Sequence, residues 1–307
     1  MKKPILTAFL SLFVVVSLAV LHPPIACGQS KTTAYVGSDA CKDCHEPYYA
    51  SYVKTVHAKK AIPGSPAASQ GCESCHGPGA AHVEQGGGKG AGDLIAFHRD
   101  EPPERKSATC LNCHGDDKGL FSWETGAHQT RGVSCTDCHT GHSGGRTHLK
   151  SREVDLCISC HKQVRNQISR QSRHPIQEGK VMCSSCHSPH GTFAKMMLRT
   201  DSKTELCFTC HQEKRGPFAF EHAPVTENCS ICHQAHGSNH ENLLARKMPQ
   251  LCQACHNTGV GHTSRAYTVQ HGFDGNATAQ KNKFFAQGCV NCHGNVHGSN
   301  RSPQFLR

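Results

Sequence analysis

The chain has 307 residues and a formal net charge of +10, and it contains 21 cysteines and 25 histidines. Hydrophobic residues make up 36% of it even with the cysteines counted, below the roughly 45 to 50% of ordinary globular domains. This composition excludes a folded interior built from apolar side chains alone.

Residues 1–28 are expected to form an export signal. Two lysines precede an apolar run over residues 5–21, and two prolines end it, which is typical of a bacterial signal peptide. We expect cleavage after Gly28. A lipoprotein site at Cys27 and an uncleaved anchor are the alternatives, because the run is close to the minimum length of a bilayer span. No later segment is long and apolar enough to cross a bilayer by itself.

Every cysteine except Cys27 belongs to a Cys-x-x-Cys-His motif, and there are ten such motifs. With histidine at 25 of 307 positions, its presence after all ten cysteine pairs has a chance probability on the order of 10⁻¹¹. The cysteines are Cys41, Cys44, Cys72, Cys75, Cys110, Cys113, Cys135, Cys138, Cys157, Cys160, Cys183, Cys186, Cys207, Cys210, Cys229, Cys232, Cys252, Cys255, Cys289 and Cys292. The adjacent histidines are His45, His76, His114, His139, His161, His187, His211, His233, His256 and His293.

This repeated histidine decides between three uses of the cysteines. A disulfide framework and zinc sites do not require it. Covalent haem attachment does, because the two thiols add to vinyl groups and the adjacent imidazole becomes the proximal iron ligand. The sequence therefore predicts ten haem c groups, which must form the interior because only about 28 residues of the processed chain accompany each one. Their propionates would bring the net charge to about −2 in the ferric state, so no nucleic-acid partner is implied.

The ten motifs fall into five modules of two. Each module has a first motif, a spacer with one histidine, a second motif and a closing histidine. The predicted boundaries are residues 29–100, 101–148, 149–197, 198–243 and 244–307. The first module is enlarged by a Gly-rich insertion over residues 77–92, which we expect to be a flexible loop.

The predicted fold is a multihaem cytochrome fold, in which short α-helices and extensive coil wrap an elongated chain of ten c-type haems with almost no β-sheet. Three leucine pairs predict a helical turn or two leading into the last three modules. These pairs are Leu149 with Leu156, Leu198 with Leu206 and Leu244 with Leu251.

The spacer and closing histidines are the candidate sixth ligands of the irons. Only four methionines follow the leader, so ten histidine–methionine haems are excluded. His190 is three residues from His187 and cannot reach the opposite face of the same iron, so it must serve another haem. The candidates are His57, His82, His128, His142, His174, His190, His222, His236, His271 and His297. His98, His148, His240 and His262 are left over as surface or propionate-contacting residues, with His262 as the alternative to His271.

Irons with two histidine ligands have no open coordination position, which favours low-potential electron transfer over catalysis. A multihaem nitrite or hydroxylamine enzyme would need an unusual attachment motif, such as Cys-x-x-Cys-Lys, or a haem without a distal ligand. The sequence has neither. We therefore expect an electron carrier with no catalytic residue.

Two segments carry a resemblance to a known family. They are Tyr-Val-Gly-Ser-Asp-Ala-Cys-Lys-Asp-Cys-His at residues 35–45 and His-Pro-Ile-Gln-Glu-Gly followed by Cys-Ser-Ser-Cys-His-Ser-Pro-His-Gly in residues 174–191. With the ten-motif layout, they resemble the DmsE/MtrA-type periplasmic decahaem c-type cytochromes. The resemblance implies a bis-histidine haem wire inside an outer-membrane porin. Such a wire links a periplasmic or inner-membrane quinol-linked cytochrome donor to an extracellular multihaem cytochrome or reductase.

A membrane conduit also has a physical rationale. A bilayer of about 40 to 45 Å with its headgroups is too thick for electrons to cross without intermediate carriers, and this polar chain cannot face lipid. An outer-membrane β-barrel porin around it would solve both problems. A soluble periplasmic electron shuttle to a terminal reductase and a protomer of an extracellular haem filament remain as alternatives. We expect a periplasmic protein associated with the outer membrane.

Overall fold

The computed structural model describes residues 34–143, 145, 147–256 and 288–307. Within these ranges the regular elements are short helices, and no strand is found. The α-helices are α1 (Ser38–Tyr52), α2 (Glu73–His76), α3 (Ala80–Glu84), α4 (Pro103–His114), α5 (Cys135–Cys138), α6 (Glu153–Cys160), α7 (Lys162–Gln167), α8 (Cys183–Cys186), α9 (Lys203–Phe208), α10 (Ala223–Glu227) and α11 (Gln250–Gln253). The 3₁₀ turns are η1 (Val56–Ala58), η2 (Pro66–Ala68), η3 (Lys118–Leu120), η4 (Gln129–Arg131), η5 (Lys195–Met197), η6 (Gln212–Lys214), η7 (Cys229–Ile231), η8 (Glu241–Leu243) and η9 (Cys289–Asn291).

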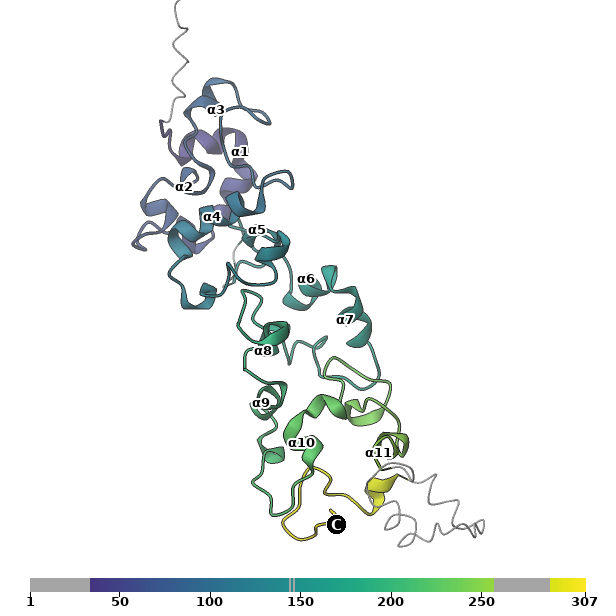
Figure 1. Cartoon of the computed structure of the whole chain (residues 1–307). Helices are drawn as coiled ribbons and strands as arrows, with labels where there is room; N and C mark the ends of the chain where they lie inside the picture. Colours follow the sequence, from purple (N-terminus) through teal and green to yellow (C-terminus); the bar gives the residue numbers. More distant parts are fainter. Residues whose placement is uncertain (1–33, 144, 146, 257–287) are drawn as a thin grey trace, which may run out of the picture.

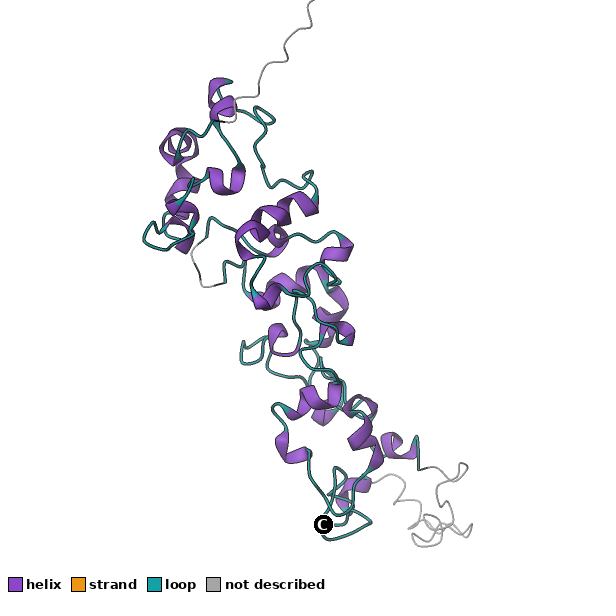
Figure 2. Ribbon diagram, turned by 60° about the vertical axis from the view of Figure 1, so that its left-hand side comes forward, coloured by secondary structure: helices purple, strands orange, loops and turns teal. Residues whose placement is uncertain are grey.

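The molecule is elongated, and its elements follow one another along the long axis in chain order. Helices α1–α3 lie at one end, α4–α7 follow, and α10, α11 and the C-terminus lie at the other end (Figure 1). The elongated outline and the helix-and-coil composition persist in a second view (Figure 2). The predicted fold class is therefore confirmed. None of the helices in the described ranges has both the length and the apolar character that crossing a membrane requires.

Each Cys-x-x-Cys-His motif begins on a helical turn. Residues three and four apart lie on the same face of a helix, so one turn points both cysteines and the histidine to one side. Polar residues just before these turns cap them. Ser202 Oγ accepts from the Glu205 N–H at the start of α9 (3.1 Å), and Asn228 Oδ1 accepts from the Ser230 N–H at the start of η7 (2.9 Å). Such caps satisfy backbone donors that a short helix leaves free.

The two motif helices of a module are joined by polar side chains. The Cys72 N–H donates to Ser38 Oγ at 3.1 Å, and the Cys135 N–H donates to Ser107 Oγ at 3.4 Å. In the third module Glu153 accepts from both the N–H and the Oγ of Ser184, at 2.7 and 2.9 Å. These bonds fix the second attachment site of a module against the first.

Apolar side chains contribute little interior in the part of the chain that the structure describes. The buried hydrophobic residues are Ala80, Trp123, Val154, Ile168, Ile176, Leu198 and Phe208. Val154, Ile168 and Ile176 form one small cluster. This sparse core agrees with an interior that must be completed by bound macrocycles.

The helical prediction for the leucine pairs is half right. Leu156, Leu206 and Leu251 lie in α6, α9 and α11. Leu149, Leu198 and Leu244 instead form isolated β-bridges with His139, His187 and His233. The chain is extended there because it pairs with the backbone of a motif histidine before the next helix begins.

The Gly-rich insertion is not the featureless loop that its composition predicts. Helix α3 lies inside it and contains His82. The turn that follows returns to this helix, since the His82 ring donates from Nδ1 to the Ala91 carbonyl at 2.9 Å. Gly92 has a φ of +69°, and a Cβ there would lie 2.9 Å from the His82 backbone nitrogen. Glycine is thus required at this close approach.

Candidate haem-binding sites

All ten motifs of the described chain open into one continuous cavity. It has a volume of about 5870 Å³ and is lined by every motif histidine and by nine of the ten predicted distal histidines. Divided among ten motifs, this gives about 590 Å³ for each, within the roughly 300 to 1,000 Å³ typical of pockets for ligands of drug size. The space, its paired thiols and its histidines fit a covalently held haem at each motif.

The attachment sites are arranged in an alternating chain. Within each predicted module the first cysteines of the two motifs lie together, at Cys41 with Cys72, Cys110 with Cys135, Cys157 with Cys183, Cys207 with Cys229 and Cys252 with Cys289. Between modules the second cysteines interact, at Cys75 with Cys113, Cys138 with Cys160, Cys186 with Cys210 and Cys232 with Cys255. Consecutive motifs are therefore always spatial neighbours.

The two thiols of such a pair shift each other's pKa strongly. A hydrogen bond with Cys110 lowers the pKa of Cys135 to about 6, and its partner's pKa is raised. The same contact with Cys252 lowers the pKa of Cys289 to about 6. Thiolates are the reactive form of cysteine, and conversion to thioethers removes the mutual perturbation. The arrangement therefore suits cysteines whose thiols become thioethers when haem is attached.

Nine of the ten motif histidines face one further histidine across the cavity. The ring centres are 6.0 to 6.3 Å apart in every pair. Two metal–imidazole bonds of about 2 Å in line, extended to the two ring centres, span about 6 Å. The pairs are His45–His82, His76–His142, His114–His57, His139–His190, His161–His128, His187–His236, His211–His174, His233–His297 and His256–His222. Each gap has the width that a six-coordinate iron between two imidazoles needs.

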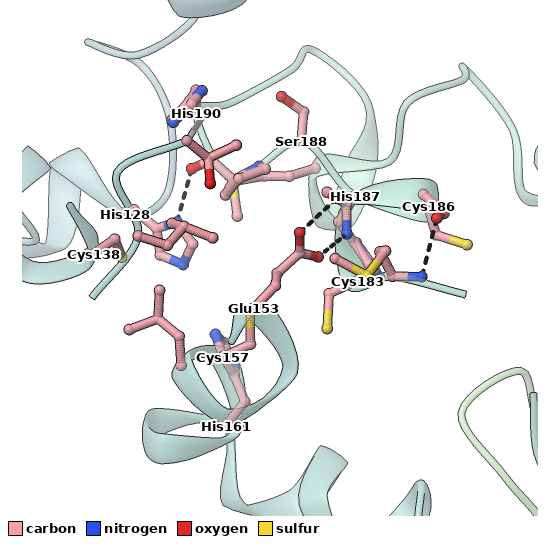
Figure 3. A pocket seen from close by; sticks show the side chains of 18 of the residues that line it. His128, Cys138, Glu153, Cys157, His161, Cys183, Cys186, His187, Ser188 and His190 are labelled. Carbon is pink, nitrogen blue, oxygen red and sulfur yellow. Dashed lines mark hydrogen bonds between the residues drawn. The ribbon is translucent and has the colours of Figure 1, made fainter. Parts of the chain in front are cut away.

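The histidine pairs cross between neighbouring modules. The spacer histidine of one module faces the first motif of the next, and the closing histidine of that next module faces back to the second motif of the previous one. His174 faces His211 in this way, and His236 faces His187. Figure 3 shows the preceding junction, where His128 and His161 lie on opposite sides of an open space. The predicted use of His190 and His174 for neighbouring sites agrees with this geometry.

Hydrogen bonds to backbone carbonyls hold the spacer histidines in place at three junctions between modules. His128, His174 and His222 donate from Nδ1 to the carbonyls of Pro189, Ala235 and Val296, at 2.8, 2.9 and 3.1 Å. Each acceptor is the residue before a closing histidine. Just after two of those histidines, Ser238 and Ser299 form β-bridges with Ser172 and Phe220 of the preceding module. The two ligand-bearing segments are thus locked together.

At the two ends of the chain the pairing of histidines between neighbouring modules does not apply. The first motif has no preceding module, and His45 faces His82 of its own module at 6.3 Å. By the same logic the last motif, at His293, would use the spacer histidine of its own module. The predicted residue, His271, and its alternative His262 lie outside the described residues. The predicted signal peptide and Cys27 lie outside them as well.

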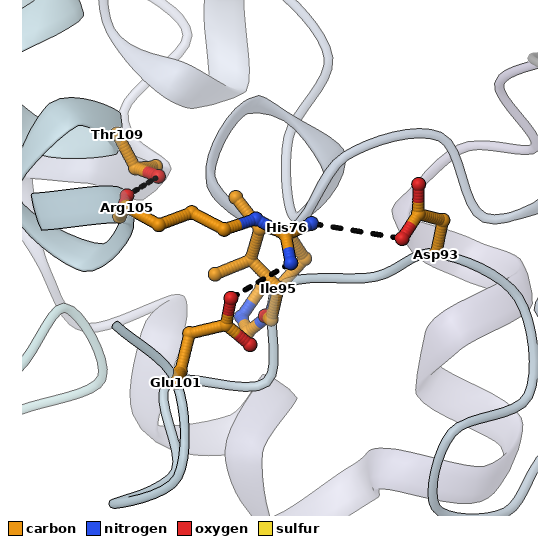
Figure 4. Close-up of polar contacts among 6 residues, drawn as sticks. All are labelled: His76, Asp93, Ile95, Glu101, Arg105 and Thr109. Carbon is orange, nitrogen blue, oxygen red and sulfur yellow. Dashed lines mark hydrogen bonds and ion pairs between the residues drawn. The ribbon is translucent and has the colours of Figure 1, made fainter. Parts of the chain in front are cut away.

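The second motif histidine of every module is held by a backbone carbonyl that sequence reasoning missed. His76, His139, His187, His233 and His293 donate from Nδ1 to the carbonyls of Ile95, Thr147, Met196, Asn242 and Gln304, at 2.6 to 2.9 Å. Such bonds fix the ring and leave Nε2 for a metal. Figure 4 shows the first of them, with Arg105 beside it paired to Glu101 at 2.7 Å. No side-chain pattern could predict acceptors that are backbone atoms.

Burial keeps many of these imidazoles neutral, the form that binds iron. Desolvation is the main cause that lowers their pKa values, with neighbouring histidines adding to the effect at several sites. The affected residues are His57, His76, His142, His190, His236 and His297.

The left-over histidines are not alike. His98, His148 and His240 all line the cavity. His148 also stacks on His57, with ring centres 5.0 Å apart. Both of its ring nitrogens are buried and have no hydrogen-bond partner. His262 lies outside the described residues.

A helix-and-coil chain whose Cys-x-x-Cys-His turns share one cavity defines a multihaem c-type cytochrome, which binds haem c through these motifs and carries electrons. Over 270 residues it is 39% identical to the multiheme cytochrome MtrA of Shewanella baltica, covering 86% of this chain and 79% of the relative. The chain belongs to the MtrA-type multihaem c-type cytochromes, and the resemblance stated above is confirmed.

Family models and more distant relatives agree with this class. The doubled CXXCH motif matches residues 128–166, 174–216 and 222–261, and the model for cytochrome c554 and c-prime matches residues 93–140. The C-type polyheme cytochrome OmcB of Geobacter sulfurreducens is 22% identical over 88% of this chain and 37% of its own. The cytochrome c-type protein NrfB of Escherichia coli is 28% identical over 38% of this chain and 72% of its own.

Proposed function

We propose that this protein is a decahaem electron conduit, the haem wire of a porin–cytochrome complex in the outer membrane. The observation that carries the proposal is the row of nine histidine pairs, 6.0 to 6.3 Å wide, along one continuous cavity of an elongated chain. A bound haem c supplies an iron that cycles between the ferric and ferrous states. The residues of the chain hold ten such groups close together in a fixed order.

Each iron is proposed to have two histidine ligands. The proximal ligand is the motif histidine, and the distal ligand is the histidine that faces it. His271 completes the set at His293. Because both axial positions are taken, the protein offers no open iron to a substrate, and we propose that it is not an enzyme.

The crossed ligands suit a conduit mechanically. Each junction contributes one histidine in each direction, so neighbouring modules cannot separate without breaking iron–imidazole bonds. His128, His174 and His222 also use Nδ1 for a backbone bond across the junction. This keeps successive sites at a fixed spacing, which electron transfer through many centres requires.

The proposed location is the periplasm, in association with the outer membrane. Residues 1–28 would direct export, and an outer-membrane β-barrel porin would separate the polar chain from lipid. A file of ten macrocycles outreaches the roughly 30 Å hydrocarbon core. The ends would then meet a periplasmic or inner-membrane quinol-linked cytochrome on one side and an extracellular multihaem cytochrome or reductase on the other.

The test rebuilds the conduit in liposomes. The holoprotein and the barrel that co-purifies with it are sealed into liposomes loaded with a reducible dye, and an external reductant that cannot cross the bilayer is added. Dye reduction should require both proteins. Failure to join any barrel, or an equal rate with the barrel alone, would overturn the conduit and favour the soluble shuttle. A filament protomer would instead assemble with copies of itself.

A further inference from the structure

His148 lies against a proposed iron ligand. Its ring stacks on that of His57 at 5.0 Å, with 25° between the planes. Both of its ring nitrogens are buried and without a hydrogen-bond partner.

The same position recurs in other modules with apolar residues. His148 directly follows Thr147, whose carbonyl accepts from the second motif histidine of the module, His139. His148 has a left-handed φ of 52°. In three other modules the residue after the equivalent carbonyl is apolar and also has a positive φ. These residues are Met197, Leu243 and Phe305, with φ values of 52°, 59° and 57°. Phe305 also contacts a spacer histidine, His222, at 5.4 Å. In these two modules the side chain at this position therefore packs on the proposed distal ligand of the first motif, His148 on His57 and Phe305 on His222.

His57 differs from the other spacer histidines in what orients its ring. Those of the next three modules donate from Nδ1 to the carbonyl before a closing histidine. Within the part of the chain that the structure describes, no such bond joins the His57 ring to Gly141, the residue before His142. The His57 ring is instead stacked against the ring of His148.

The plane of His57 is also exceptional. It makes an angle of 72° with its partner His114, whereas the other described pairs range from 8° to 59°. We infer that His148 is a positioning residue, which holds the distal ligand of the third haem nearly perpendicular to the proximal one. The inference rests on the proposed bis-histidine ligation.

Ring planes have a direct spectroscopic readout. Perpendicular axial imidazoles leave the two iron d orbitals that overlap them nearly degenerate, so the ferric low-spin EPR signal is strongly anisotropic, with a large maximal g value. More parallel planes separate these orbitals and give a rhombic signal. The third haem should therefore contribute a large-g signal of about one haem in ten, and His57→Met, which replaces the ligand, should remove it.

The test compares frozen ferric holoprotein of the wild type with His148→Phe and His148→Leu. Phe and Leu both occur at this position in other modules, so each variant should fold. We expect His148→Phe, which keeps a flat ring, to retain the large-g signal. We expect His148→Leu to convert it to a rhombic one without loss of covalent haem.

Phe305→Ala is the matched control, because the Val296 carbonyl still holds His222. It should leave the spectrum unchanged. An unaltered His148→Leu spectrum, the same change in His148→Phe, or an equal change in Phe305→Ala would overturn the role of His148 alone. High-spin iron at the third haem of the wild type would instead overturn the proposed ligation, and this inference with it.

Discussion

The rings of His76 and His142 lie 6.0 Å apart and within 8° of parallel, although they belong to different modules. His76 is held by the Ile95 carbonyl at 2.7 Å, and His142 comes from the segment after the fourth motif. An iron between them would join the first module to the second. Haem ligation would therefore hold the modules together. The loss of a single ligand should affect both the haem site and the stability of the fold.

Mature holoprotein should contain ten covalent haems and be low-spin throughout when ferric. The reason is that every proposed iron has two imidazole ligands and no open position. Haem content per chain, the ferric absorption spectrum and carbon monoxide binding to the reduced protein measure this. Rapid binding of carbon monoxide by a substantial fraction of the haems would show open irons and would revive an enzymatic role.

Replacing His190 with Met should raise the potential of one haem, the one attached at Cys135 and Cys138. His190 faces His139 at 6.0 Å, and thioether ligation favours ferrous iron. We expect an upward shift on the order of 100 mV, a fraction of the range over which axial ligands move haem potentials. A spectroelectrochemical titration of all ten haems would detect it.

His240→Met is the control for that substitution, because His240 has no place in the proposed ligand set. Its titration should match the wild type. Equivalent shifts in the two variants would mean that the assignment of His190 as a ligand is wrong. His148 is not a suitable control, since its ring contacts His57.

Replacing Gly237 with Ala should weaken one iron site through the backbone. Gly237 follows His236, has a φ of +143°, and a Cβ there would clash with the Gln167 carbonyl and lie 3.4 Å from the Ser172 carbonyl oxygen. The segment must move to relieve the clash, which draws His236 away from His187. We expect a high-spin fraction of about one haem in ten and a loss of about 1–3 kcal/mol in unfolding free energy.

Gly141→Ala offers the comparison, because Gly141 also adjoins a proposed distal ligand, His142, but a Cβ there meets nothing within 4 Å. Its spectrum and stability should stay close to those of the wild type. If Gly237→Ala were equally silent, the close approach of the modules would not control ligation.

Sequence spacing was enough to locate the ten motifs that line the cavity and to select nine histidines that each face a motif histidine. These are His57, His82, His128, His142, His174, His190, His222, His236 and His297. It could not say which of them faces which motif. His174 and His211, for example, are brought together by packing between modules, and the bond that orients His174 ends on the carbonyl of Ala235. Backbone acceptors leave no trace in a side-chain pattern.

Other features were misjudged because composition was used without tertiary context. The glycines of residues 77–92 suggested a loop, yet helix α3 forms there and presents His82 to His45. Leu149 suggested a helix but pairs with His139 in a β-bridge. His148 was left out of the ligand set because it and His240 lie at different offsets in their connectors and a third connector has no histidine. The structure adds that the position of His148 recurs in other modules with apolar side chains.

Glu73 should be the residue that secures the N-terminal end of the haem chain. It lies between the cysteines of the second motif, is only 4% exposed, and accepts from the backbone N–H groups of Val36, Gly37 and Gly79 at 2.7 to 3.2 Å. The segment that it holds leads directly into α1, which carries the first motif. Glu73 thus ties the first two attachment sites together.

Replacing Glu73 with Ala should lower the free energy of unfolding by about 3 kcal/mol, because three backbone donors lose a charged acceptor inside the protein. Guanidinium denaturation followed by circular dichroism measures the loss, and limited proteolysis should show earlier cleavage before α1. Glu84→Ala on the exposed side of α3 removes the same charge nearby and should cost little. Equal stability of the two variants would show that this carboxylate does not anchor the first haem site to the second.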